Sequence, residues 1–200
     1  MNNFQEQNAI RIIKANNGFM RTNEAIKNHI HPRIFYRLRD NGTLEQISYG
    51  LYKLKTNKIS NPDFITIALR VPDGVICLIS ALAFHNLTTQ VPHKIWIAIK
   101  RGTSRPKVKY PPIHTNQFSG QSFSSGIEKH TFNKIPVKIY SPEKTLADCF
   151  KFRNKIGMSI VLEALHFYRE RKNFNPSKLM KYAKICRVAN IMKPYVESII

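Results

Sequence analysis

The chain has 200 residues, 42% of them apolar, and its 32 Lys and Arg against 12 Asp and Glu give a formal net charge of +20. That length and apolar content allow one or two domains with a real core, while no apolar run approaches the ~18 residues of a membrane-spanning helix. Three widely spaced cysteines without a C-x-x-C pair, and a start without the basic-then-apolar pattern of a signal peptide, predict a cytoplasmic protein with reduced thiols. The positive charge repels itself in a compact fold, and nucleic acid is the commonest polyanion that relieves such repulsion.

A first helix is predicted over residues 4–16, because Ala9, Ile10 and Ile13 fall on one apolar stripe. The polar sequence Asn-Asn-Gly ends this helix, and a short extended piece is expected over residues 19–21.

Two more helices are predicted next. Thr22 is a good N-cap residue, since its side-chain oxygen can accept from the amides of a helix over residues 23–29. Pro32 suits the first turn of a third helix, which continues to residue 39 and is stopped by Gly42, a residue suited to positive φ.

A hairpin follows the third helix. Residues 43–47 and 51–55 are two apolar-rich runs joined by Ser48-Tyr49-Gly50. Helix, helix and hairpin in this spacing predict a winged helix-turn-helix, in which the third helix enters the major groove and the hairpin lies beside it on the DNA backbone.

The third helix supports this prediction by its two faces. At 100° per residue, Phe35 and Leu38 share one side, while Arg33, Arg37 and Asp40 cluster opposite. Two arginines one turn apart are the side chains that read guanine O6 and N7, although many winged helices bind protein instead of DNA. We expect DNA contacts from residues of both parts of the chain: Thr22, Arg33, Tyr36, Arg37, Arg39, Ser48, Tyr49, Lys100, Arg101 and Arg105.

A polar segment with a proline, residues 56–62, predicts the domain boundary, so that residues 1–56 form the winged helix-turn-helix and residues 57–200 a larger α+β domain. The first part carries 9 basic and 4 acidic residues, which leaves +15 of the net charge to the second. The second part is predicted to contain helices over 63–71 and from 75 to about 86, strands over 94–99 and near 113–117, a hairpin of 126–132 with 135–140, and a helical C-terminal half. That half begins with a helix capped by Ser141 with Pro142 at its first position, followed by helices over 158–171, 176–186 and 191–200.

No catalytic constellation, metal site or cofactor motif is predicted. Glu143 and Asp148, five residues apart, point to different faces of one helix, so a two-metal nuclease lacks evident ligands. Helix capping explains Glu143, and Asp148 is expected to pair with a base such as Lys144 or Lys151. Cys149 is expected to be a buried thiol. The histidines lack metal-ligand spacing, and the glycines lack a Walker or Rossmann pattern.

The sequence also resembles a known family along nearly its whole length. The stretch Gly42-x-Leu44-Glu45-x-Ile47-x-x-Gly50-x-Tyr52-x-Leu54, after Tyr36-Arg37-Leu38, is similar to the winged-helix start of the AbiEi-type antitoxins. Further similar landmarks are Ser80-Ala81-Leu82, His85, Leu87-Thr88, Pro92, Trp96-Ile97-Ala98-Ile99 and Ser141-Pro142-Glu143-Lys144-Thr145-Leu146-x-Asp148. Arg39 departs from the family pattern, which usually has an apolar residue there, and so do Gln46 and Ser48, where more Arg is usual.

The resemblance implies an antitoxin of a bacterial type IV toxin–antitoxin system of the abortive-infection type, which defends against phage. Its winged helix would bind double-stranded operator DNA and repress its own operon, while the second domain antagonises a nucleotidyltransferase toxin. The alternative is a basic, nuclease-like nucleic-acid enzyme that a winged helix directs to its target. The first reading implies no enzymatic activity, no cofactor and no membrane partner.

Overall fold

The structure is a computed structural model that describes residues 2–48, 50–55 and 61–199. It is a mixed α+β protein, as predicted. The chain divides into two compact units: unit 1 comprises Met1–Thr66 with Thr131–Ile135, and unit 2 comprises Ile67–His130 with Pro136–Ile200. The predicted linker includes residues 56–60, which lie outside the described part, so the domain boundary after residue 56 stays a prediction.

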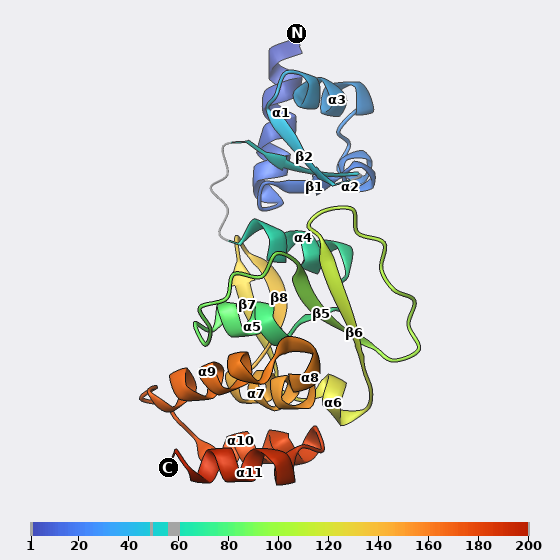
Figure 1. Cartoon of the computed structure of the whole chain (residues 1–200). Helices are drawn as coiled ribbons and strands as arrows, with labels where there is room; N and C mark the ends of the chain where they lie inside the picture. The colour runs from blue at the N-terminus through green and yellow to red at the C-terminus, as the bar shows by residue number, and fades with distance from the viewer. Residues whose placement is uncertain (1, 49, 56–60, 200) are drawn as a thin grey trace. The chain divides into compact units, whose positions relative to one another are not determined.

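Within residues 2–48 and 50–55, unit 1 contains three helices and a three-stranded antiparallel sheet of order β1-β3-β2 (Figure 1). Its elements are α1 (Asn2–Ala15), β1 (Phe19–Arg21), α2 (Thr22–Lys27), α3 (Pro32–Asp40), β2 (Leu44–Ser48) and β3 (Leu51–Leu54). The predicted helices, extended piece and hairpin are confirmed. Most of their predicted ends lie within one or two residues of the observed ends. The extended piece also pairs with the hairpin, which closes the sheet.

The core of unit 1 lies between the helices and the sheet. Ile13, Phe35 and Leu38 are almost fully buried there, and the ring of Phe35 meets that of Tyr52 edge to face at 5.1 Å between centroids. Aromatic pairs in this geometry add roughly 0.5–1.5 kcal/mol beyond their buried area. The apolar side of α3 is therefore fixed against the sheet, and its other side stays at the surface.

A five-stranded sheet of order β6-β5-β4-β8-β7 belongs to unit 2, except for the tip of its β7–β8 hairpin, which is assigned to unit 1. In this sheet β5 runs antiparallel to β4 and parallel to β6. The two-residue turn Asn133–Lys134, in which both residues have positive φ, joins β7 to β8 as in a tight hairpin. The strands are β4 (Val75–Ile76), β5 (Ile95–Lys100), β6 (Ile113–Phe118), β7 (Ile127–Phe132) and β8 (Ile135–Tyr140). The helices are α5 (Leu78–Phe84), α6 (Gln121–Ser124), α7 (Pro142–Lys151), α8 (Arg153–Ile156), α9 (Met158–Arg169), α10 (Pro176–Ile185) and α11 (Ala189–Glu197), while α4 (Pro62–Arg70) spans the division between the units.

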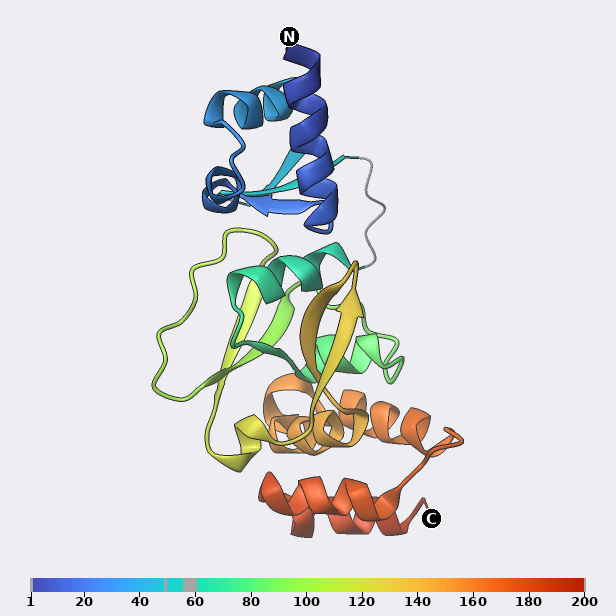
Figure 2. The same cartoon turned by 180° about the vertical axis from the view of Figure 1, so that it is seen from behind.

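The helical C-terminal part of unit 2 forms two layers beyond the sheet. Figures 1 and 2 show α7, α8 and α9 next to the sheet and the pair α10–α11 outside them. The Ser141 side chain accepts a hydrogen bond from the Lys144 amide at the start of α7, which confirms the predicted cap. No helix in the described parts of the chain is both long and apolar enough to cross a bilayer.

The prediction of a helix from residue 75 was wrong at its start. Val75 and Ile76 form β4, which pairs with Ala98 and Ile97 of β5 and, on its other side, with Ile139 of β8. A short apolar run has no periodicity that separates strand from buried helix, so these partners, 21 to 63 residues away, decide its conformation.

Candidate nucleic-acid interface

The start of α3 is set by local hydrogen bonding. His31 is the N-cap residue, and its Nδ1 accepts from the Arg33 amide at 3.2 Å, while Pro32 occupies the first helical position. Asn41 ends the helix and Gly42 follows with φ of 76°, a conformation that costs glycine little. These signals place the first residue beyond Pro32, Arg33, at the exposed end of the helix.

Arg33, Tyr36 and Arg39 lie on one surface of α3, on which Arg33 and Tyr36 are exposed and Arg39 is half-buried. Among the described residues, no carboxylate pairs with Arg33, which is exposed. The Tyr36 ring is 37% exposed, and the Arg39 guanidinium lies over it at 4.9 Å from the ring centroid. Arg39 is held there by Asp40, whose Oδ1 accepts from its Nε at 2.8 Å. The surface therefore combines one unpaired cation with a cation stacked on an aromatic ring.

Arg37 is not part of this exposed surface, contrary to prediction. Its Nε lies 2.6 Å from Oε1 of Glu6 on α1, and the two side chains are only 32% and 23% exposed. The helical wheel placed Arg37 beside Arg33 correctly. It could not show the carboxylate, because Glu6 belongs to a helix that packs against α3 only in the folded unit.

Thr22 is not the N-cap residue of α2, so this prediction was also wrong. Arg21 takes the N-cap position, and its amide donates to Oε2 of Glu24 at 2.8 Å. Thr22 is half-buried, and its amide donates to the Gly50 carbonyl at 3.0 Å, which ties α2 to the hairpin. The third-position glutamate explains the difference, because it satisfies the amide that precedes the helix.

The remaining predicted DNA contacts lie in the hairpin and in the second part of the chain. Tyr49 and the side chain of Ser48 lie outside the described part of the structure, so their contacts with DNA stay predictions. Lys100, Arg101 and Arg105 are exposed at the end of β5 and in the loop that follows it, and they belong to unit 2. Arg33, Tyr36 and Arg39 therefore lie on one helix of unit 1, whereas Lys100, Arg101 and Arg105 belong to unit 2.

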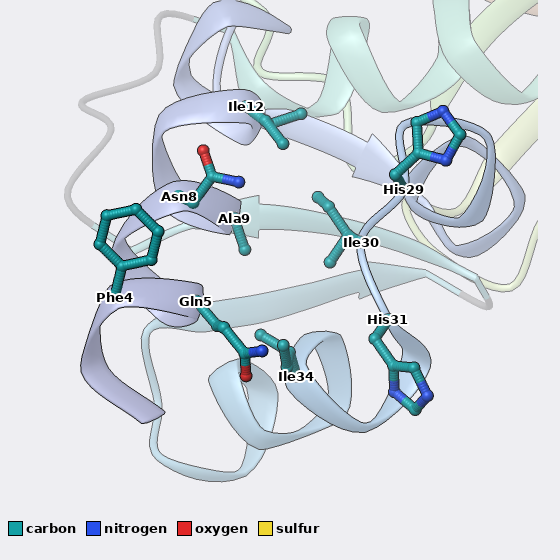
Figure 3. A pocket seen from close by; sticks show the side chains of 9 residues that line it. All are labelled: Phe4, Gln5, Asn8, Ala9, Ile12, His29, Ile30, His31 and Ile34. Atoms are coloured by element: carbon teal, nitrogen blue, oxygen red, sulfur yellow. The ribbon is translucent and has the colours of Figure 1, made fainter. Parts of the chain in front are cut away.

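A shallow pocket of about 240 Å³ lies between α1 and the turn that precedes α3 (Figure 3). Its wall mixes apolar and polar side chains, and its titratable residues are two histidines, of which His31 already accepts the Arg33 amide at the helix cap. This lining provides no acid–base pair. The residues that line it are Phe4, Gln5, Asn8, Ala9, Ile12, His29, Ile30, His31 and Ile34.

The acids that sequence reasoning weighed as nuclease ligands are buried and occupied. Glu143 accepts from the Tyr168 hydroxyl at 3.0 Å and pairs with Lys178 at 3.0 Å. Burial opposes its ionisation, but hydrogen bonds, including those from Lys178 and Tyr168, outweigh burial and lower the pKa of Glu143. Glu143 thus links α7 to α9 and α10, a role that capping alone did not predict.

Asp148 pairs with Lys144, as predicted, but both side chains are almost fully buried. Asp148 also accepts from the Cys186 thiol, with 3.2 Å between Sγ and Oδ1, and burial raises its pKa in spite of the Lys144 ammonium. Cys149 is buried, as predicted, and burial raises the pKa of its thiol. No group of three or more potential metal ligands occurs within residues 2–48, 50–55 and 61–199.

Comparisons with known proteins add no identification. Neither a scan of protein-family models nor a search of curated proteins found a match to this chain.

Proposed function

We propose that the N-terminal part of the chain is a winged helix-turn-helix that binds double-stranded DNA through α3, and that the whole chain is an antitoxin which represses its own operon. The observation that carries the DNA-binding proposal is the surface of Arg33, Tyr36 and Arg39 on a helix whose opposite face is buried. The antitoxin proposal rests on the sequence resemblance to the AbiEi-type family.

The geometry of α3 suits base readout. Recognition helices enter the major groove with the residues near their N-terminus toward the bases, and Arg33 is the second residue of α3. An arginine without a carboxylate partner keeps its donors for guanine O6 and N7, so it loses no ion pair on binding. Arg37, which is paired with Glu6, is assigned a structural role instead.

The second activity, antagonism of a nucleotidyltransferase toxin, is assigned to the part of the chain after the winged helix. The alternative, a nuclease, has less support, because Glu143 and Asp148 are engaged by Tyr168, Lys178 and Lys144. A carboxylate that holds a buried structural contact is poorly placed to bind a catalytic metal ion and a phosphodiester.

Binding to DNA upstream of the chain's own reading frame tests the first activity. Arg33→Ala should weaken binding to that DNA by ~1–3 kcal/mol and should weaken binding to random DNA much less. Arg11→Ala is the matched control, since Arg11 is an exposed arginine on α1 and its loss changes the net charge equally. Equal effects of the two substitutions on both DNAs would remove the specifying role from Arg33.

A growth assay tests the second activity. In cells with an inducible nucleotidyltransferase from the neighbouring reading frame, the Arg33→Ala variant should restore growth while its own promoter stays derepressed. Rescue that depends on promoter binding would show that neutralisation works through transcription, and the division into two activities would be wrong.

A further inference from the structure

Unit 2 carries a pair of aromatic rings, tilted against each other, on the edge strand β6 and its neighbour β5. Trp96 of β5 and His114 of β6 are direct partners in the parallel register, and their ring centroids lie 4.1 Å apart with 36° between the planes. Because partners in register point to the same face of a sheet, the two rings stand side by side there.

The two rings are held differently. Trp96 is half-buried against the core of unit 2, and its amide donates to the Ser80 hydroxyl at 2.9 Å, which fixes the start of β5 to α5. His114 is exposed on the edge strand β6. The Trp96 ring is therefore held in place by the fold, and the His114 ring beside it is accessible.

Three cations from three different segments act on the charge of His114. Lys94 precedes Trp96 by two residues, Arg105 lies in the loop between β5 and β6, and Lys155 belongs to α8. After partial burial, the positive charges of these three residues lower the pKa of His114. All three are exposed, and no carboxylate in the described part of the chain pairs with any of them. Four further exposed cations occupy the end of β5 and the loop between β5 and β6: Lys100, Arg101, Lys107 and Lys109.

We propose that the Trp96–His114 pair and the cations around it form a binding site for single-stranded nucleic acid. An unpaired base stacks on the accessible His114 ring, and the adjoining phosphates bind Arg105, Lys94 and Lys155. Aromatic platforms within a cationic track are the arrangement that binds single strands without sequence preference. The proposal concerns unit 2 and goes beyond the operator binding assigned to α3.

Two other polyanions fit these observations less well. Duplex DNA covers its base faces by stacking, so it would use the cations and leave the ring pair without a role. An acidic protein surface would likewise engage the cations alone. The exposed aromatic ring is the feature that favours a single strand.

Fluorescence of the full chain tests the proposal directly, because Trp96 is its one tryptophan. Oligothymidylate of about eight nucleotides, within the usual range of site sizes, should change the Trp96 emission as it binds. His114→Ala should weaken binding about tenfold, since one stacked base contributes on that order, and His114→Tyr should restore it. His166→Ala, a change of an exposed histidine on α9, is the control that should bind like the unchanged chain.

Charge is tested separately. Arg105→Ala should weaken binding and reduce the slope of log K against log[salt] by about 0.7, as for one lost phosphate contact on a single strand. Oligouridylate of the same length distinguishes RNA from DNA as the preferred strand. Circular dichroism and the urea midpoint of each variant establish that it is folded.

Three outcomes would overturn the proposal: unchanged Trp96 emission at saturating oligothymidylate, equal affinity of the His114→Ala variant, or equal competition by a duplex or an oligoglutamate peptide. The Arg33→Ala variant separates this site from the operator site, because it should lose operator binding and keep the oligothymidylate affinity. Failure of the operator assay alone therefore does not contradict the single-strand site, and failure of the oligothymidylate assay alone does not contradict operator binding by α3.

Discussion

Two arginines one turn apart on α3 differ in what holds them. Arg33 has no carboxylate partner among the described residues and is exposed, whereas Arg37 pairs with Glu6 at 2.6 Å. An ion pair that is about two-thirds buried restrains the side chain, because its release would leave a carboxylate unpaired in a partly desolvated place. Although both arginines lie on the same face of α3, Arg33 is thus available for a ligand and Arg37 is engaged by Glu6.

His85 is a buried residue through which we expect the stability of unit 2 to depend on pH. Its Nε2 lies 2.7 Å from the Tyr140 carbonyl, and burial lowers its pKa although that hydrogen bond acts the other way. The folded state then binds fewer protons at this site than the unfolded state below pH ~6.5, so its stability falls as the pH falls through that value toward the folded pKa. We expect the free energy of unfolding to decrease there by at most about 1.4 kcal/mol per pH unit on account of this group.

Urea unfolding followed by Trp96 fluorescence between about pH 7 and pH 5 measures this effect. His85→Gln keeps a donor for the carbonyl and removes the titration, so its stability should depend less steeply on pH. His166→Gln is the control, since His166 is exposed on α9. Parallel pH profiles for His85→Gln and the unchanged chain would contradict the assignment.

At the scale of elements, α7 is unusual because residues of every face of it are buried. Neighbours on several sides enclose it, and Gly126 contributes a close approach: a Cβ at this position would lie 2.6 Å from Cβ of Lys144, and φ is 73°. Lys144 is accordingly almost fully buried, with its ammonium on Asp148 and 4.2 Å from the centroid of the Tyr140 ring. Charged residues are almost never fully buried unless they are paired. The Lys144–Asp148 ion pair is therefore required for α7 to occupy this buried position.

Replacement of one member of the Lys144–Asp148 pair should lower the free energy of unfolding more than replacement of both. Lys144→Met leaves the Asp148 carboxylate buried without its cation and should reduce the free energy of unfolding by ~3–5 kcal/mol. Adding Asp148→Leu removes the uncompensated charge and should recover part of that loss. Urea unfolding detected at Trp96 measures both variants, and a double variant no more stable than Lys144→Met would show that the pair is not the source of the effect.

At the scale of the whole molecule, each unit has a hydrophobic core of its own. The core of unit 1 includes Ile13, Phe35 and Leu38, and that of unit 2 includes Leu146, Val161 and Tyr168. Separate cores are what two separable activities require, because a change in one then leaves the structure of the other intact. The net charge of +20 is likewise spread along the chain, with +5 in residues 1–56 and +15 in residues 57–200.

The cores should respond separately to mutation. Leu38 is fully buried in unit 1, so Leu38→Ala should destabilise that unit by ~2–5 kcal/mol and leave the transition seen by Trp96, in unit 2, unchanged. Leu146→Ala, at a fully buried position of unit 2, should lower the Trp96 transition instead. Circular dichroism reports the unfolding of both units, and Trp96 fluorescence that of unit 2. If either substitution shifts the transitions seen by both methods equally, the chain unfolds as one cooperative body.

The sequence by itself determined the features whose causes lie within a few residues. The Ser141 cap with Pro142 behind it, the stop at Gly42, the Asn133–Lys134 turn and the three helices of unit 1 all follow from hydrogen bonds and φ preferences that neighbours in the chain satisfy. The exposed position of Arg33 follows from the same periodicity.

Only the tertiary structure decided the features that need a distant partner. Val75–Ile76 became a strand because β5 and β8 flank it, Arg37 was removed from the exposed surface by Glu6, and Trp96 met His114 through the pairing of β5 with β6. Local spacing carries no information about which remote group will satisfy a strand edge, a charge or a ring face. Those choices are made when the chain packs, because burial leaves each such group only the partners that the fold brings within reach.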